Sequence, residues 1–226
     1  MKVPDSLKYL LTRIGSHLSS KTIYYLDASI NFLEVGRWLH DTGLDPKQRF
    51  DNRWQLFDLV GAQLADQNVL YLEFGVSSGS VTRYWCQLLR SPHAIIHGFD
   101  SFEGLPEDWI LHQKGDFSAG GALPDIDDAR VQFFKGWFEQ TLPNYTLPAH
   151  ENLVIIMDAD LYSSTSFVLK SLEKHIILGT YIYFDEFNVR NDELRAFGEL
   201  LARTDMKFSL VGATRTLHEI MFQRVQ

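Results

Sequence analysis

Residues 70–80 read Leu-Tyr-Leu-Glu-Phe-Gly-Val-Ser-Ser-Gly-Ser, and this stretch decides how the chain folds. The apolar run indicates a buried strand, and Gly75 and Gly79 favour a tight turn that leads into a helix. The first N–H groups of such a helix carry a partial positive charge that suits a carboxylate or a phosphate. An ordinary connection between a strand and a helix has the same pattern, so the surrounding sequence must decide whether a ligand binds here.

Short apolar runs alternate with amphipathic segments from residue 69 onward. We expect strands at 69–74, 94–99, 131–135, 153–157, 179–184, 207–211 and 218–222. We expect helices at 79–89, 137–142, 164–175 and 192–204. Alternating strands and helices form βαβ units, whereas the short connection before the last strand requires an antiparallel pair. The pattern predicts an α/β fold with a mostly parallel seven-stranded sheet that ends in a C-terminal antiparallel hairpin.

The N-terminal part, residues 1–67, reads as a helical extension of the same single domain, with the α/β core at 68–226. Periodic apolar residues predict three helices, at 5–18, 22–40 and 46–65. The apolar face of the third helix must pack on a larger body. The first two helices carry more apolar surface than one sheet face needs, and this favours a homodimer through them.

Composition and charge narrow the class of protein. The chain has 226 residues, 45% of them hydrophobic, and a net charge of −8. A chain of this size can fold without a metal or a disulfide, and its charge has the wrong sign for nucleic acid or an anionic membrane. The single cysteine, Cys86, lies among apolar residues and predicts a buried thiol in a reducing compartment. Without a signal-peptide core or a membrane span, we expect a cytoplasmic protein.

Acidic residues stand at the ends of the first two predicted strands. Glu73 lies at the end of the first, and Asp100 follows the second, where doubly wound folds hydrogen-bond the ribose of a nucleoside. The glycine turn lacks the G-x-G-x-x-G pattern of dinucleotide sites, and Glu73 would repel a pyrophosphate. A cofactor with an adenosine, a cationic centre and no phosphate suits this site, and S-adenosylmethionine has these properties.

Two further predicted strands end in pairs of acids. Asp158 and Asp160 follow the strand at 153–157, and Asp185 and Glu186 follow the next one. If these strands are parallel neighbours, their ends lie roughly 5 Å apart, and two carboxylates at that distance repel by roughly 3 kcal/mol. A cation would remove this cost, and an all-oxygen ligand set favours Mg²⁺, Mn²⁺ or Ca²⁺. Alternatively, Asp160 caps the following helix and Glu186 points to solvent.

A long connection at 101–128 separates two of the predicted strands. Loops of this length in compact domains are usually functional or disordered. Its aromatic residues, Phe102, Trp109 and Phe117, favour an ordered lid that excludes water from a site.

Five runs in a fixed order, LEFGVSSGS, GFDSFEGLPEDW, FKGWFEQTLP, MDADLYSST and YFDEF, carry a resemblance to a known family. From about residue 69 to 187 the chain resembles the class I S-adenosylmethionine-dependent methyltransferases of the macrocin O-methyltransferase type, which implies their Rossmann-like fold. The resemblance implies cofactor contacts at Glu73, Gly75, Gly79, Asp100, Ser101, Phe102, Gly136 and Trp137.

The same resemblance implies a divalent-metal site at Asp158, Asp185 and Glu186, with Asp158 also as the catalytic base. Family members usually have Asp at the third of these positions, and this chain has Glu186. The catalytic His of the family lid has no secure match in this chain: His112 is the candidate, and a lone His in a polar loop is more often a solvated residue.

The expected function is transfer of a methyl group from S-adenosylmethionine to a hydroxyl of a small molecule, a natural product for instance, assisted by a divalent cation, with Mg²⁺ expected. Three alternatives stay open. Asp158-Ala159-Asp160 also reads as the D-x-D motif of a glycosyltransferase, although that leaves Glu73 and Asp100 unexplained. A non-catalytic binding or assembly protein of methyltransferase shape is the second alternative. A dehydrogenase is the third, and it lacks the phosphate turn.

Overall fold

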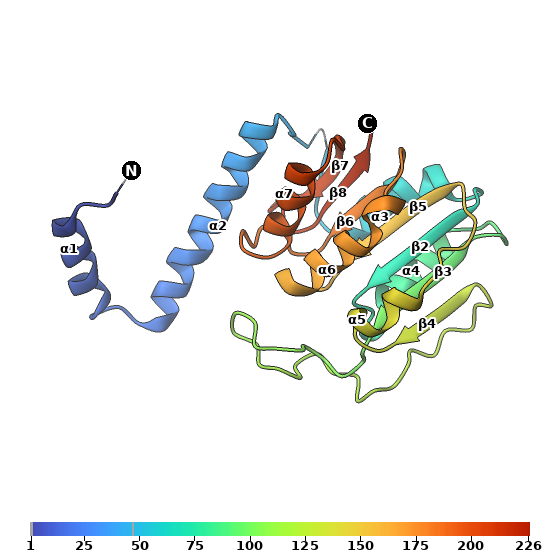
Figure 1. The fold of residues 1–226 in the computed structure, drawn as a ribbon, viewed down its shortest axis with the longest axis horizontal. Coiled ribbons are helices and arrows are strands. Elements are labelled where there is room, and N and C mark those ends of the chain that lie inside the picture. The colour runs from blue at the N-terminus through green and yellow to red at the C-terminus, as the bar shows by residue number, and fades with distance from the viewer. Residues whose placement is uncertain (1, 47) are drawn as a thin grey trace.

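The computed structural model describes residues 2–46 and 48–226, and one sheet runs through the body of the molecule (Figure 1). Its strands are β1 (Arg49–Phe50), β2 (Val69–Phe74), β3 (Ile95–Asp100), β4 (Val131–Lys135), β5 (Asn152–Met157), β6 (Tyr181–Phe184), β7 (Phe208–Thr214) and β8 (Ile220–Arg224). They lie in the order β1-β7-β8-β6-β5-β2-β3-β4. All neighbours are parallel except the two pairs that involve β8. The expected parallel sheet with a C-terminal antiparallel hairpin is confirmed.

The helices are α1 (Asp5–Gly15), α2 (Ser20–Thr42), α3 (Arg53–Leu64), α4 (Ser80–Leu88), α5 (Phe138–Thr141), α6 (Tyr162–Leu172) and α7 (Glu193–Arg203). Two short 3₁₀ turns, at Leu142–Asn144 and Glu173–His175, follow α5 and α6. The helix predicted at 46–65 begins only at Arg53, because residues 49–50 form β1 and pair with β7. Residue 47 of that predicted helix lies outside the described residues. The sheet therefore gains an eighth, two-residue strand that the sequence pattern does not predict.

Side chains of each central strand alternate between two hydrophobic layers. In β2, Leu70, Leu72 and Phe74 belong to the layer that contains α6, α7 and the end of α2. Val69 and Tyr71 face the opposite layer, where α3 and α4 pack. Strands covered on both faces in this way read as continuous apolar runs, and that is why no alternating pattern marks them in the sequence.

Helices α1 and α2 lead away from the sheet (Figure 1). Helix α1 has no buried residue, and α2 buries only Val35 and Leu39, near its C-terminal end. Arg190 ties the middle of α2 to the body through a 2.7 Å ion pair with Asp27 and a 2.6 Å hydrogen bond to Asn31. Among the described residues, no helix combines the length and the apolar character that crossing a membrane requires.

The turn after β2 lies directly against the end of β5. Gly75 has a φ of +92°, and a Cβ atom at this position would lie 1.7 Å from the carbonyl oxygen of Asp158. The N–H of Gly75 donates to the carbonyl oxygen of Phe99 at the end of β3, with an N···O distance of 3.1 Å. Only glycine allows this close approach, so the ends of three strands meet at this residue.

We predict that Gly75→Ala lowers the free energy of unfolding by roughly 3 kcal/mol or more, because the methyl group would overlap a backbone atom in a backbone conformation that favours glycine. Gly198→Ala in α7 is the matched control: no atom lies within 4 Å of its added Cβ, and its φ is not in the left-handed region. This control should gain about 0.5 to 1 kcal/mol. Thermal and urea unfolding measure both changes, and a Gly75→Ala variant as stable as the wild type would contradict the packing described.

Candidate functional site

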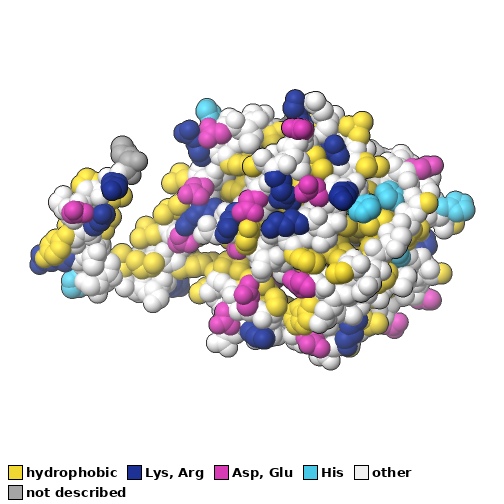
Figure 2. Space-filling view, viewed as in Figure 1, with side chains coloured by type: hydrophobic (Ala, Val, Ile, Leu, Met, Phe, Trp, Pro, Cys, Tyr) yellow, Lys and Arg dark blue, Asp and Glu magenta, His cyan; other side chains and the backbone are white. Residues whose placement is uncertain are grey.

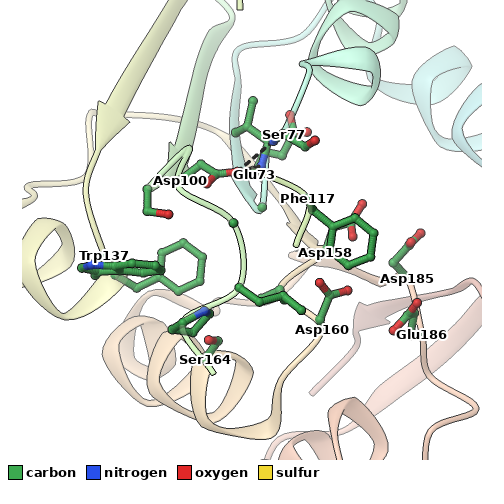
Figure 3. Close-up of a pocket in the computed structure, with 18 of the residues that line it drawn as sticks. Glu73, Ser77, Asp100, Phe117, Trp137, Asp158, Asp160, Ser164, Asp185 and Glu186 are labelled. Carbon is green, nitrogen blue, oxygen red and sulfur yellow. Dashed lines mark hydrogen bonds between the residues drawn. The ribbon is translucent and has the colours of Figure 1, made fainter. Parts of the chain in front are cut away.

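A cavity of about 710 Å³ opens at the carboxyl ends of the parallel strands. Its wall includes residues that follow β2, β3, β4, β5 and β6, which is the edge where open α/β sheets bind ligands. The acidic side chains Asp158, Asp160, Asp185 and Glu186 gather on the side opposite Trp137, as Figure 3 shows. The volume lies within the range of small-molecule and cofactor pockets.

Glu73 forms the floor of the cavity next to the glycine turn. Its side chain is 1% exposed and accepts hydrogen bonds from the hydroxyls of Tyr71 (2.8 Å) and Thr82 (2.5 Å). Burial raises the pKa of Glu73 to about 8, and these two hydrogen bonds limit the rise. A cationic group beside Glu73 would favour its ionised form. The floor therefore suits a ligand that carries an ammonium.

Asp100 fixes the glycine turn through its carboxylate. Its Oδ2 accepts hydrogen bonds from the backbone N–H groups of Val76 and Ser77, both at 2.8 Å (Figure 3). Its Oδ1 accepts one from Phe102 N–H at 2.7 Å. A carboxylate has about four lone-pair positions, so Asp100 retains capacity for a ribose hydroxyl. It shapes the turn as well as lining the cavity.

Of the residues predicted to bind the cofactor, six line the cavity and two do not. Ser101, Gly136 and Trp137 line the cavity together with Glu73, Gly75 and Asp100. Gly79 and Phe102 do not line it. Gly79 forms the N-terminal cap of α4 with a φ of +75°, and Phe102 is buried with its ring against Phe133. No side chain caps α4, and its first residues, Ser80 and Val81, line the cavity, so its N-terminus suits a carboxylate.

Asp158 and Asp185 stand side by side, as the sequence predicts. Met157 pairs with Phe184, so the two aspartates begin at the same level of adjacent parallel strands. Burial raises the pKa of both carboxyl groups, and in Asp158 the neighbouring Asp185 raises it further. The Tyr183 hydroxyl donates a hydrogen bond to Asp185 Oδ1 and favours the ionised form of that residue.

Asp160 and Glu186 complete the acidic wall. Burial, and then the charge of Asp185, raises the pKa of Asp160 to about 7. Burial, and then the charge of Asp160, raises the pKa of Glu186 to about 8. The Oε2 atom of Glu186 is buried without a hydrogen-bond partner, so the alternative that Glu186 points to solvent is wrong.

Asp160 does not cap the following helix, and this alternative is also wrong. The residue before α6 is Leu161, which provides no side-chain cap. Instead, the N–H of Tyr162 donates to Asp192 Oδ1 at 3.2 Å, from the start of α7. Asp160 adopts a φ of +59° and lines the cavity. Non-glycine residues held in this backbone region often lie at functional sites.

Arg53 is a site residue that the sequence pattern does not reveal. It begins α3, and its Nη1 lies 2.8 Å from Asp185 Oδ1 and 3.5 Å from Asp158 Oδ2. Its Nε lies 3.5 Å from Glu219 Oε1. A guanidinium stays charged at any physiological pH. One permanent cation therefore lies between the two aspartates that the resemblance assigns to a metal.

Asp158, Asp185 and Glu186 fit a divalent cation by their chemistry. All three line one cavity, they offer only oxygen atoms, and Glu186 has an unpartnered buried oxygen. Their present arrangement is not that of a formed site: within residues 2–46 and 48–226, no three His, Cys, Asp or Glu side chains are grouped to hold a metal ion. Arg53 pairs with two of the three carboxylates.

The long connection at 101–128 closes one side of the cavity. Phe117 lines the cavity, whereas Trp109 is buried and donates from its indole N–H to Asp192 Oδ2 at 3.0 Å. His112 does not line the cavity: it packs against Phe117 and lies 3.3 Å from Asp116. The imidazole of His112 is partly exposed, and its charge limits the rise that burial causes in the pKa of Asp160 on the cavity wall.

Comparisons with known proteins give consistent matches in sequence. Residues 122–210 match the model of the macrocin-O-methyltransferase family, TylF. The demethyldecarbamoylnovobiocin O-methyltransferase of Streptomyces niveus is 34% identical over 134 residues, which cover 51% of this chain and 50% of that protein. The 8-demethyl-8-(2,3-dimethoxy-alpha-L-rhamnosyl)-tetracenomycin-C 4'-O-methyltransferase of Streptomyces olivaceus is 30% identical over 112 residues, which cover 40% of this chain and 41% of that protein. The chain spans about half the length of the relatives it matches.

The comparison of structures gives the fold. The solved structure of the O-methyltransferase NovP superposes with a TM-score of 0.59 at 21% sequence identity, and the match covers 92% of this chain and 100% of that one. At this identity the similarity establishes the architecture only. The resemblance that the five sequence motifs carry is confirmed: the chain has the Rossmann-like class I methyltransferase fold, and its residues 122–210 match the macrocin-O-methyltransferase family of S-adenosylmethionine-dependent enzymes.

Proposed function

We propose that this protein is an S-adenosylmethionine-dependent O-methyltransferase that methylates a hydroxyl on a small natural product, on its sugar or its aglycone. One observation carries the proposal: a single cavity is lined both by Glu73 and Asp100 and by Asp158, Asp160, Asp185 and Glu186. The two relatives whose names give O-methylation of natural products support the substrate class. The cytoplasmic location stays a prediction.

The cofactor end matches S-adenosylmethionine group by group. Glu73 suits the ammonium, the uncapped N-terminus of α4 suits the carboxylate, and Asp100 suits the ribose hydroxyls. Trp137 and Gly136 offer the surface for the adenine. When bound, the cofactor supplies a methyl group on a positively charged sulfur. Asp158, Asp160, Asp185 and Glu186 would then be the residues nearest to a bound acceptor, and holding the acceptor in one orientation would contribute to the rate.

Asp158 is placed to take the proton that the acceptor hydroxyl loses. Its carboxylate lines the cavity and its side chain is 28% exposed, which leaves room for a substrate oxygen. Burial raises the pKa of Asp158, and a higher pKa makes its ionised form a stronger base. Asp158 would accept the hydroxyl proton while the acceptor oxygen gains the methyl group that the cofactor sulfur loses.

We further propose that Asp158, Asp185 and Glu186 hold a divalent cation, with Mg²⁺ expected from the all-oxygen donor set. When bound, the ion would lower the pKa of the acceptor hydroxyl. The unpartnered Oε2 of Glu186 and the mutual repulsion of the aspartates support this site. Glu186 reaches further than the usual aspartate by one methylene.

Calorimetric titration with S-adenosylhomocysteine tests the cofactor assignment directly. We predict binding with one site per chain and a rise in the midpoint of thermal unfolding. A uridine or thymidine diphosphate sugar serves as the second titrant. If the nucleotide sugar gives binding heat and S-adenosylhomocysteine gives none, the methyltransferase assignment is wrong and a D-x-D glycosyltransferase is favoured. Binding without methyl transfer to any of a panel of glycosides and phenols would favour the non-catalytic alternative.

Asp158→Asn tests the assignment of the base. Because a positioned base contributes about 100-fold or more, we predict that kcat falls by at least this factor, while the affinity for S-adenosylhomocysteine stays within about threefold of the wild type. Asp66→Asn is the control, since Asp66 pairs with Arg90 on the surface. Turnover by Asp158→Asn at more than about a third of the wild-type rate would exclude Asp158 as the base.

We also propose that two copies pair through α1 and the first part of α2. The apolar side chains exposed there include Leu7, Leu10, Leu11, Ile14, Ile23, Tyr25, Leu26, Ile30 and Leu33. Figure 2 shows hydrophobic patches on the arm that leaves the body, mixed with charged and other side chains. An isolated eleven-residue helix such as α1 is marginal in water, so a partner helix would stabilise it. A second copy of this chain supplies a surface of the same kind.

Light scattering at micromolar concentration should give twice the chain mass of 26.0 kDa. Leu33→Asp, at a side chain that is 73% exposed, should shift the protein to one chain mass, because a charge would be buried in the interface. Leu178→Asp, at a residue that is 67% exposed outside these helices, is the matched control and should stay dimeric. A wild-type protein of single chain mass would contradict the pairing.

A further inference from the structure

Arg53 occupies the centre of the acidic wall. Its guanidinium contacts three carboxylates, those of Asp185, Asp158 and Glu219, at 2.8, 3.5 and 3.5 Å. The Arg53 side chain is 26% exposed, and those of Asp185 and Glu219 are 9% and 15% exposed. These ion pairs are largely shielded from water, so they are screened less than surface pairs.

Two of these three carboxylates are also the first two residues of the proposed metal site. A metal ion on Asp158 and Asp185 would share these two carboxylates with Arg53 Nη1, which lies 3.5 Å and 2.8 Å from one oxygen of each. Two positive charges on the same pair of carboxylates repel each other strongly in a partly buried site, and a divalent ion doubles the repulsion that a single charge would give. Arg53 in its present position and a divalent ion on these aspartates therefore oppose each other strongly.

Glu219 is an ion-pair partner of Arg53 that lies outside the proposed metal site. Its carboxylate contacts the Nε side of the guanidinium, whereas the two aspartates contact Nη1. Glu219 is not among the proposed metal ligands, so this ion pair can persist when the aspartates turn to another cation. Arg53 and the proposed metal ion would therefore compete for Asp158 and Asp185, whereas Glu219 pairs with Arg53 alone.

We propose that Arg53 is a built-in counter-ion of the Asp158–Asp185 pair, and that it and a divalent cation exclude each other at this position. Arg53 keeps the two buried aspartates neutralised in the metal-free protein, and it weakens metal binding by the work needed to displace it. This inference rests on the metal site of the proposed function. The new element is that the affinity of this site for a divalent cation depends on Arg53 as well as on the three ligand residues.

Calorimetric titration of the full chain with Mn²⁺ tests this proposal without any turnover. Arg53→Gln should bind Mn²⁺ about tenfold more tightly than the wild type, or better, because the competing charge is gone. Arg53→Lys keeps a positive charge and should stay within about threefold of the wild type. Arg90→Gln removes the same charge from an exposed pair with Asp66 and should leave the affinity unchanged, which controls for net charge.

A second measurement follows Arg53 in the wild-type protein itself. In ¹⁵N-labelled wild-type protein, the side-chain Nε–Hε signal of Arg53, assigned by its loss in Arg53→Lys, should shift as Mg²⁺ saturates the site. Thermal unfolding gives a third readout: Arg53→Gln should have a lower midpoint than the wild type without metal and should gain more from Mn²⁺.

Three results would overturn the proposal. The first is an Mn²⁺ affinity of Arg53→Gln within about twofold of the wild type. The second is an equal gain in Arg90→Gln, which would make the effect one of net charge. The third is an absence of Mn²⁺ binding in both the wild type and Arg53→Gln. Titration with S-adenosylhomocysteine in the same samples tests the cofactor site separately, so failure of the methyltransferase assignment is distinguishable from failure of the role of Arg53.

Discussion

The contact between the ends of β2 and β5 organises the whole site. Phe74 pairs with Met157, which in turn pairs with Phe184, so the residues after β2, β5 and β6 start at one level. At Gly75 the backbone comes so close to Asp158 that no side chain fits. This contact places the glycine turn, and with it the cofactor end of the cavity, directly beside the acids that follow β5 and β6.

Because the strand ends meet at one level, several acidic side chains are buried close together and repel one another. Burial raises the pKa of Glu73, Asp158, Asp160, Asp185 and Glu186, all on the wall of one cavity. Burying a carboxylate is costly unless it is protonated, hydrogen-bonded or paired with a cation. The protein uses hydroxyl donors at Glu73 and the guanidinium of Arg53 at the aspartates. A ligand that brings positive charge would complete this compensation, whereas a pyrophosphate would add to the negative charge of the site.

The sequence predicts those strands that the residues within them and at their two ends are enough to define. The strands at 69–74 and 131–135 match the structure residue for residue, because apolar runs bounded by polar and glycine residues mark both ends. It also predicts that the acids after β5 and β6 meet, because carboxyl ends of parallel neighbours lie at one edge. Both predictions need only the order of the elements along the chain.

Features that depend on distant partners are not predictable in this way. Strand β1 exists only because β7 pairs with it, and the two are far apart in sequence. Arg53 reaches the aspartates from the start of a helix with no motif around it, so composition and spacing give no signal. The first N–H of α6, that of Tyr162, is likewise capped by a distant residue: Asp192, just before α7, accepts its hydrogen bond, and the adjacent Asp160 does not. Phe102 lies in a predicted cofactor motif, yet its side chain packs on β4.

A crystal structure of the protein with S-adenosylhomocysteine tests the central claim most directly, because it shows both whether the cavity binds the ligand and in which direction. We predict density for the adenine at Trp137, the ribose at Asp100 and the sulfur toward Asp158. Ligand density outside this cavity, or a reversed molecule with its adenine among Asp158, Asp185 and Glu186, would contradict the account.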